Sequence, residues 1–67
     1  MLLVLDRPGL SLGYERAALL VYEEGERKRS VPVKSLERVV VGPSLELSAG
    51  VLGLLAQHGV SLLVLNH

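Results

Sequence analysis

Residues 31–67 read VPVKSLERVVVGPSLELSAGVLGLLAQHGVSLLVLNH. Within this stretch, residues Arg38–Val41, 49–58 and 60–65 predict a strand, a helix and a second strand. Gly42 and Pro43 end the first strand, because proline has no amide donor and glycine permits a turn. The second strand is apolar on both faces, and such a strand must be covered on both sides. We therefore expect this small domain to pack against a second copy or a larger body.

The predicted helix has clear boundaries and no charged face. Ser48 is a good N-cap because its hydroxyl can accept from a free amide of the first turn, and Gly59 ends the helix. Residues 49–58 contain no Asp, Glu, Lys or Arg, and a helix without a charged face is usually buried most of the way round. Gly50 and Gly53 each cost about 1 kcal/mol relative to Ala, so they predict close packing against another backbone.

The N-terminal half predicts an antiparallel meander with short turns. The expected strands are Leu2–Leu5, Leu10–Glu15, Ala18–Glu23 and 27–31. Pro32 cannot donate to a ladder, so the fourth strand is an edge strand or ends there. Residues 33–37 read as an irregular turn or one helical turn, and residues 44–47 as a candidate short strand.

These elements predict an α+β fold that is mostly β. Antiparallel hairpin strands are followed by strand–helix–strand, with one buried helix packed on the sheet. If the strands at Arg38–Val41 and 60–65 share a sheet, the helix is their crossover connection. Residues 1–67 are expected to form a single small domain, because the length leaves no room for a second one.

Size and composition favour association. The chain has 67 residues, 49% of them hydrophobic, and no Cys, Phe or Trp. A chain of this length buries only about 60% of its unfolded surface. Small proteins without disulfides or structural metals commonly gain burial by oligomerising. We therefore expect a homo-oligomer, most simply a dimer. The candidate core and interface residues are Val51, Leu52, Leu54, Leu55, Leu62 and Val64.

The charge pattern gives little support for strong DNA binding. The formal net charge is zero, whereas strong non-specific binding to nucleic acid needs a net positive charge. Arg27, Lys28 and Arg29 could contact DNA phosphate, but the preceding glutamates can pair with them across the hairpin. On a regular strand, Arg27 and Arg29 share one face and Lys28 points to the other.

No residue type in the chain points to catalysis. His58 and His67 have no acidic neighbour at metal-ligand spacing, and His58 suits a capping or packing role in the last helical turn. The serines lack recognisable His and Asp partners. We therefore predict no catalytic residue, cofactor or metal ligand in this chain. The first apolar run, residues 1–5, is too short for a signal peptide or membrane span, so the expected compartment is the cytoplasm.

The order of elements resembles a known family. Residues 29–42 (RSVPVKSLERVVVG), 45–48 (LELS) and 51–65 (VLGLLAQHGVSLLVL) carry the resemblance. They are similar to the N-terminal β domain of the CRISPR-associated integrase, the endonuclease of the adaptation module that acquires spacers in antiviral defence. An apolar strand with a Pro-Gly turn, like residues 2–9 here, opens that domain as well.

The resemblance implies self-association without catalysis. Family members continue into a helical domain that binds Mg²⁺ or Mn²⁺ through Glu, His and Asp or Glu ligands, and no residue here matches those ligands. Their N-terminal domains form much of the homodimer contact. We therefore expect a non-catalytic dimerisation module, a stand-alone or truncated N-terminal domain.

Two alternatives stay open. The chain could be one half of a split metal-dependent nuclease, completed by a separate helical partner chain. It could instead be a small β nucleic-acid binder. The cations available for that role are Arg27, Lys28, Arg29, Lys34 and Arg38.

Overall fold

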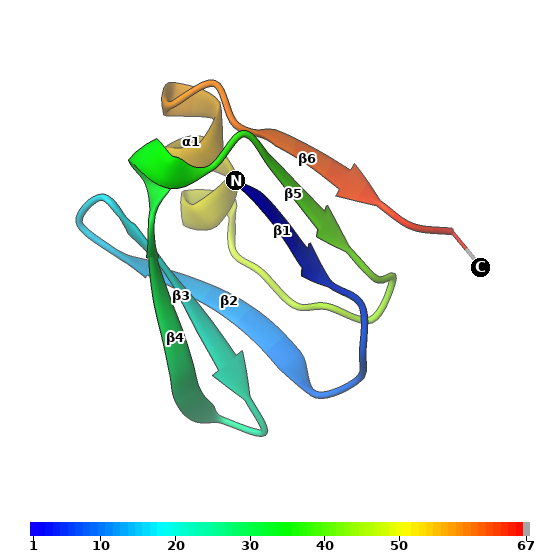
Figure 1. The fold of residues 1–67 in the computed structure, drawn as a ribbon. Helices are drawn as coiled ribbons and strands as arrows, with labels where there is room; N and C mark the ends of the chain where they lie inside the picture. The colour runs from blue at the N-terminus through cyan, green and yellow to red at the C-terminus, as the bar shows by residue number, and fades with distance from the viewer. Residues whose placement is uncertain (67) are drawn as a thin grey trace.

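Two three-stranded sheets and one α-helix make up the computed structural model, which describes residues 1–66 (Figure 1). His67, for which we predicted no metal-binding role, lies outside the described residues. The parallel sheet has the order β1-β5-β6 and the antiparallel sheet the order β2-β3-β4. The elements are β1 (Leu2–Leu5), β2 (Leu10–Glu15), β3 (Ala18–Glu23), β4 (Glu26–Pro32), a 3₁₀ turn (Val33–Ser35), β5 (Arg38–Val41), α1 (Ala49–Gln57) and β6 (Ser61–Val64).

This architecture confirms the predicted α+β, mostly β, fold class. β2, β3 and β4 form the predicted antiparallel meander, and Pro32 ends β4 at the edge of its sheet. The strand at Leu2–Leu5 forms but does not join that meander, because it pairs in parallel with β5 in the other sheet. The helix connects β5 to β6, which are parallel neighbours. The candidate strand at residues 44–47 does not form. It makes one bridge, Ser11 to Glu46, in which the Leu12 amide donates to the Glu46 carbonyl at 2.9 Å, because the chain then turns into the helix at Ser48.

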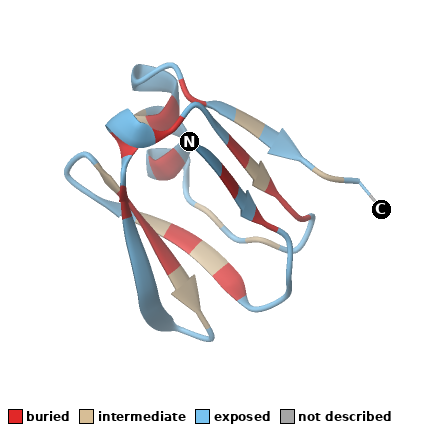
Figure 2. Ribbon diagram, viewed as in Figure 1, coloured by how far each residue is buried: buried red, intermediate tan, exposed pale blue. Residues whose placement is uncertain are grey.

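The hydrophobic core lies between the two sheets and is closed at one end by α1. Buried and exposed residues alternate along β1, as Figure 2 shows, because successive strand side chains point to opposite faces. Among residues 1–66 no polar or charged residue is buried. The most completely buried large side chains are Leu19, Val33, Val39, Val51 and Leu55.

The helix packs on the sheets as predicted, but it is buried over one face rather than most of the way round. Val51 and Leu55 are buried, with 0% and 2% of their surface exposed, whereas Leu52 is 44% exposed. Among the elements of residues 1–66, only β2 and β6 make substantial contact with α1, so no layer of this part of the chain lies above its opposite side. The N-cap prediction is confirmed, since the Val51 amide donates to Ser48 Oγ at 3.3 Å.

The final strand is also less covered than its composition predicts. β6 is an edge strand of the parallel sheet, and β5 is its one strand neighbour in the described part of the chain. Leu62 is half-buried against the core, but Leu63 and Val64 are exposed. The antiparallel sheet therefore covers β1 and β5 better than it covers β6.

The two helix glycines have different surroundings, which corrects the expectation that both pack against a backbone. A Cβ on Gly50 would lie 2.6 Å from Tyr14 Cε1, whereas a Cβ on Gly53 would meet nothing within 4 Å. Gly50 therefore lets the Tyr14 ring lie against the helix, and Gly53 faces open space.

This difference predicts opposite responses to the same substitution. Gly53→Ala should raise the free energy of unfolding by about 1 kcal/mol, because alanine is the better helix former. Gly50→Ala should gain clearly less or lose stability, because the Tyr14 ring must move aside. Urea unfolding followed by circular dichroism measures both values. Equal gains in the two variants would contradict the Tyr14 contact.

None of the helices found in residues 1–66 combines the length and the apolar character needed to cross a membrane.

Candidate interaction surface

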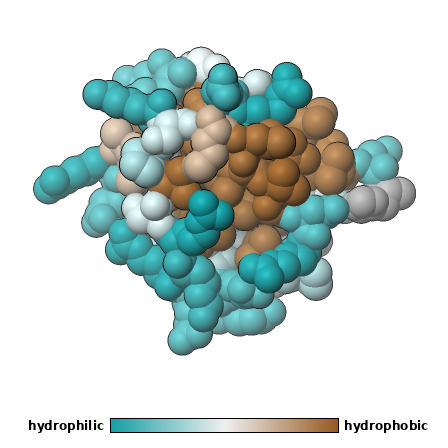
Figure 3. Space-filling model, viewed as in Figure 1, coloured by the Kyte–Doolittle hydropathy of each residue, from teal (hydrophilic) through white to brown (hydrophobic). Residues whose placement is uncertain are grey.

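The outer side of the parallel sheet is an apolar surface that no element of the described chain covers. We call Leu2, Val4, Val40 and Leu63 the outer sheet face. Leu2, Val4 and Leu63 are 58%, 55% and 49% exposed, and Val40 is half-buried. Figure 3, which looks onto this side of the molecule, shows a contiguous apolar area over β1, β5 and β6.

Strand register brings these four residues together. Val4 pairs with Val40, and Val40 pairs with Leu63, so the three side chains form one row across the sheet. Leu3 and Val39, which alternate with them, point the other way and are buried in the core. The face therefore exists because β1, β5 and β6 are each apolar at the positions that point away from the core.

An exposed apolar face is unusual for a parallel sheet. Purely parallel sheets occur almost only where both faces are covered, and extended apolar surface on a soluble protein commonly marks an interaction site. Here the antiparallel sheet and the helix cover the inner face alone. The geometry is therefore that of a two-layer structure with an open position for a third layer.

The two ends of the outer sheet face carry opposite charges. Arg38 is exposed and pairs with Leu2 at one end of the sheet. At the other end, a Cβ on Gly42 would collide with Asp6 Oδ1, which places the Asp6 carboxylate beside Gly42. The apolar row of Val4, Val40 and Leu63 thus lies between a cation and an anion.

The N-terminus is fixed at the Arg38 end of the same sheet. The Met1 ammonium group donates to the Ser35 carbonyl at 2.7 Å and to Glu37 Oε2 at 3.2 Å. The Glu37 amide in turn donates to the Met1 carbonyl at 3.0 Å. These contacts hold the first residue of the chain against the segment that leads into β5, so β1 begins in a defined register.

The predicted core and interface residues divide between two environments. Val51 and Leu55 belong to the core, and Leu54 and Leu62 pack against it. Leu52 and Val64 are exposed, but neither belongs to the outer sheet face. Sequence reasoning missed Leu2, Val4, Val40 and Leu63. The signal that could have found them is that residues 2–5, like residues 60–65, have no polar face.

The basic group at Arg27, Lys28 and Arg29 is split by a β-bulge. Tyr22 pairs with Arg27 and Val21 pairs with Arg29, which leaves Lys28 as the extra residue. Arg27 pairs with Glu15 at 3.7 Å, and Lys28 pairs with Glu26 at 3.3 Å on its own strand. The prediction that Arg27 and Arg29 share one face, with Lys28 on the other, is wrong. Arg27 and Arg29 pair with the successive residues Tyr22 and Val21, whose side chains point to opposite faces, and Lys28 lines the same cleft as Arg29.

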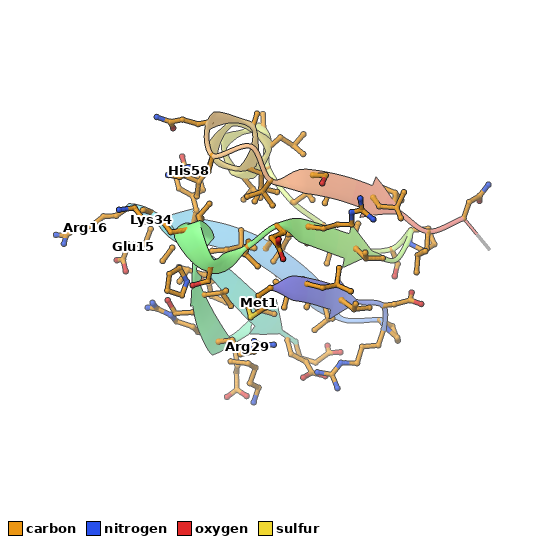
Figure 4. The ribbon with its side chains drawn as sticks, turned by 45° about the horizontal axis from the view of Figure 1, so that its top comes forward. Met1, Glu15, Arg16, Arg29, Lys34 and His58 are labelled. Carbon is orange, nitrogen blue, oxygen red and sulfur yellow. The ribbon has the colours of Figure 1, made fainter. Side chains whose placement is uncertain are left out.

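The wider set of cations does not form one basic surface. The Val33 amide donates to the Ala17 carbonyl at 2.9 Å, which places Lys34 near the β2–β3 turn. Figure 4 shows Lys34 with Arg16 and Glu15 at that end of the molecule, apart from Arg29. Arg38 lies on the parallel sheet. This arrangement gives no continuous track for a nucleic-acid backbone.

The described residues contain no group of three or more His, Cys, Asp or Glu side chains that could hold a metal ion. His58 instead closes the end of the helix, where its Nδ1 lies 3.1 Å from the Leu54 carbonyl oxygen. The family resemblance places its Mg²⁺ or Mn²⁺ ligands in a separate helical domain, and the described residues do not form a second site of that kind.

Comparison with known proteins identifies the family. Residues 3–67 match the family model described as CRISPR associated protein Cas1. Over 62 residues the chain is 39% identical to the CRISPR-associated endonuclease Cas1 of Korarchaeum cryptofilum (strain OPF8). The match covers 92% of this chain and 18% of that relative, so the chain spans less than a fifth of the relative's length. The chain belongs to the CRISPR associated protein Cas1 family.

Proposed function

We propose that this chain is a self-association module of the Cas1 family, in which two copies pack their outer sheet faces against each other. The observation that carries the proposal is the uncovered apolar face of a parallel sheet. A second copy supplies the missing layer, and its own face is covered by the same contact.

The size of the chain supports a second copy as the covering layer. A chain of 67 residues buries a small fraction of its surface and has a correspondingly small stability margin. It contains no cysteine, so a disulfide cannot compensate. Burial of Leu2, Val4, Val40 and Leu63 would add to its core at about 25 cal/mol per Å² of apolar surface removed from water.

The charges at the ends of the face favour a twofold arrangement. In a symmetric dimer each copy presents the same patch, and when the twofold axis lies across the strands a residue at one end of one copy meets the other end of its partner. Arg38 of one copy then approaches Asp6 of the other, and the apolar rows stack between them. Opposite charges at such rims set orientation and register more than affinity.

The proposal assigns no cleavage activity to these residues. The relative named above is an endonuclease, but this chain corresponds to 18% of its length. A role in association uses the residues that the chain has, whereas DNA cleavage would need a metal site that its described residues do not form.

Sedimentation equilibrium at several protein concentrations tests the proposal. The expected mass at high concentration is twice the 7.2 kDa of one chain, and it should fall toward the single-chain mass on dilution. Circular dichroism of the same samples reports whether the monomer stays folded. A folded single-chain mass at every concentration would refute self-association.

A further inference from the structure

The outer edge of β6 is a candidate binding site that the proposed self-association does not use. β6 pairs with β5 on one side, and within residues 1–66 no strand lies on its other side (Figure 1). The Ser61 and Leu65 amides donate to carbonyl oxygens on the β5 side, at 3.2 and 2.8 Å. Because the backbone groups of successive residues point to opposite sides of a strand, the N–H and C=O groups of Leu62 and Val64 point to the free edge.

The other three sheet edges each carry a feature that discourages the addition of a strand. The Leu12 amide of β2 donates to the Glu46 carbonyl, so a loop covers that edge. β4 has a bulge at Lys28 and ends at Pro32. β1 borders a cleft that the charged side chains of Lys28 and Arg29 line. β6 has no charged residue, no proline and no shift of register with β5, so its edge alone is left open to pairing.

The size of this edge favours a flexible segment over a second folded copy. β6 has four residues, and two of them direct their backbone groups outward. A stable interface between folded proteins buries about 800 Å² per partner, which one short strand edge cannot supply. An extended peptide needs no such area, because main-chain hydrogen bonds along the edge supply its affinity.

The surroundings of the edge select the side chains of that segment. Residues 49–65, which form α1 and β6, contain no Asp, Glu, Lys or Arg. Leu62 is half-buried and Val64 is 56% exposed, so a charged side chain placed beside them would lose water without gaining a partner. We propose that the free edge of β6 binds an extended, uncharged peptide segment of another protein as an additional antiparallel strand. Antiparallel pairing is the more stable arrangement per residue.

Amide shifts and hydrogen exchange of the ¹⁵N-labelled chain test this proposal. The probe is the peptide acetyl-Lys-Thr-Val-Thr-Val-Thr-Lys-amide, whose lysines keep it soluble and flank the pairing residues. At a chain concentration where sedimentation gives the single-chain mass, the peptide should cause saturable shifts in β6. It should slow exchange of the Leu62 and Val64 amides at least tenfold, and that of the Leu63 amide, which points toward β5, less than twofold.

Two matched comparisons show whether backbone pairing is responsible. The same peptide N-methylated at its five central residues has no donor there and should bind at least tenfold more weakly. Val64→Pro removes a donor from the free edge, a position where an edge strand tolerates proline, and should also weaken binding at least tenfold. Val64→Thr keeps the amide and should change binding less than twofold.

Four results would overturn the proposal. The first is the absence of saturable shifts, and the second is equal binding of the N-methylated peptide. The third is normal binding to Val64→Pro while its spectrum shows a folded chain; if that variant does not fold, the N-methylated peptide decides. The fourth is protection of the Leu62 and Val64 amides that rises with chain concentration without peptide, which would assign the edge to a second copy. Val64 lies outside the outer sheet face, so these results do not depend on the proposed dimer.

Discussion

The Leu63→Asp variant should be a folded monomer under conditions where the unmodified chain is a dimer. In the single chain Leu63 is 49% exposed, so an aspartate there keeps its contact with water and the fold survives. In the proposed dimer the same position lies in the centre of an apolar contact. Each copy would then bury an unpaired carboxylate, which costs several kcal/mol per ion. Since 1.4 kcal/mol is a factor of ten in affinity, dimerisation should weaken by at least a hundredfold.

A second variant makes this result specific to one surface. Leu52→Asp introduces the same charge at a leucine that is 44% exposed on α1, away from the outer sheet face. It should leave the dimer intact. Sedimentation equilibrium and circular dichroism of the two variants give mass and fold together. If Leu52→Asp dissociates the dimer and Leu63→Asp does not, the interface lies on the helix, and the outer sheet face has another role.

The sequence could predict the elements because turn residues mark their ends. Gly9, Gly25 and Gly59 each adopt a positive φ, at 83°, 81° and 68°, where L-residues are disfavoured and glycine is not. Gly9 and Gly25 lie in the turns that lead into β2 and β4, and Gly59 follows the end of α1. Ser48 likewise begins the helix through a local hydrogen bond. These signals act over a few residues, so they can be read without knowing the tertiary structure.

The sequence indicates strands without a polar face, but which of their residues form the candidate surface could not be predicted, because that depends on contacts between distant segments. The pairing of β1 with β5 joins residues 36 positions apart, as in Leu2 with Arg38. Only that pairing separates exposed Leu2 and Val4 from buried Leu3 and Leu5 in a run that is apolar throughout. The bulge at Lys28 is equally invisible in a strand pattern of period two, because it arises from register with β3.

Leu55→Asp should prevent folding at every concentration, in contrast to Leu52→Asp on the same helix. Leu55 is 2% exposed and belongs to the core shared by both sheets. Removing its side chain alone costs about 2–5 kcal/mol, and an unpaired buried carboxylate adds several more. Native domains are stable by about 0.05–0.15 kcal/mol per residue, which gives roughly 3–10 kcal/mol for a chain of this length. The penalty is therefore comparable to the whole free energy of folding.

The measurement is the circular dichroism melting curve of the two variants, with Leu55→Ala as an intermediate case. Leu55→Asp should show no cooperative transition, and Leu55→Ala should melt below the unmodified chain. Leu52→Asp should melt close to it, because substitutions at exposed sites usually change stability by no more than about 0.5 kcal/mol. These three leucine variants separate the two faces of α1. Equal melting temperatures for Leu55→Asp and Leu52→Asp would mean that the helix does not pack on the core through Leu55. That result would contradict the packing of α1 against the two sheets.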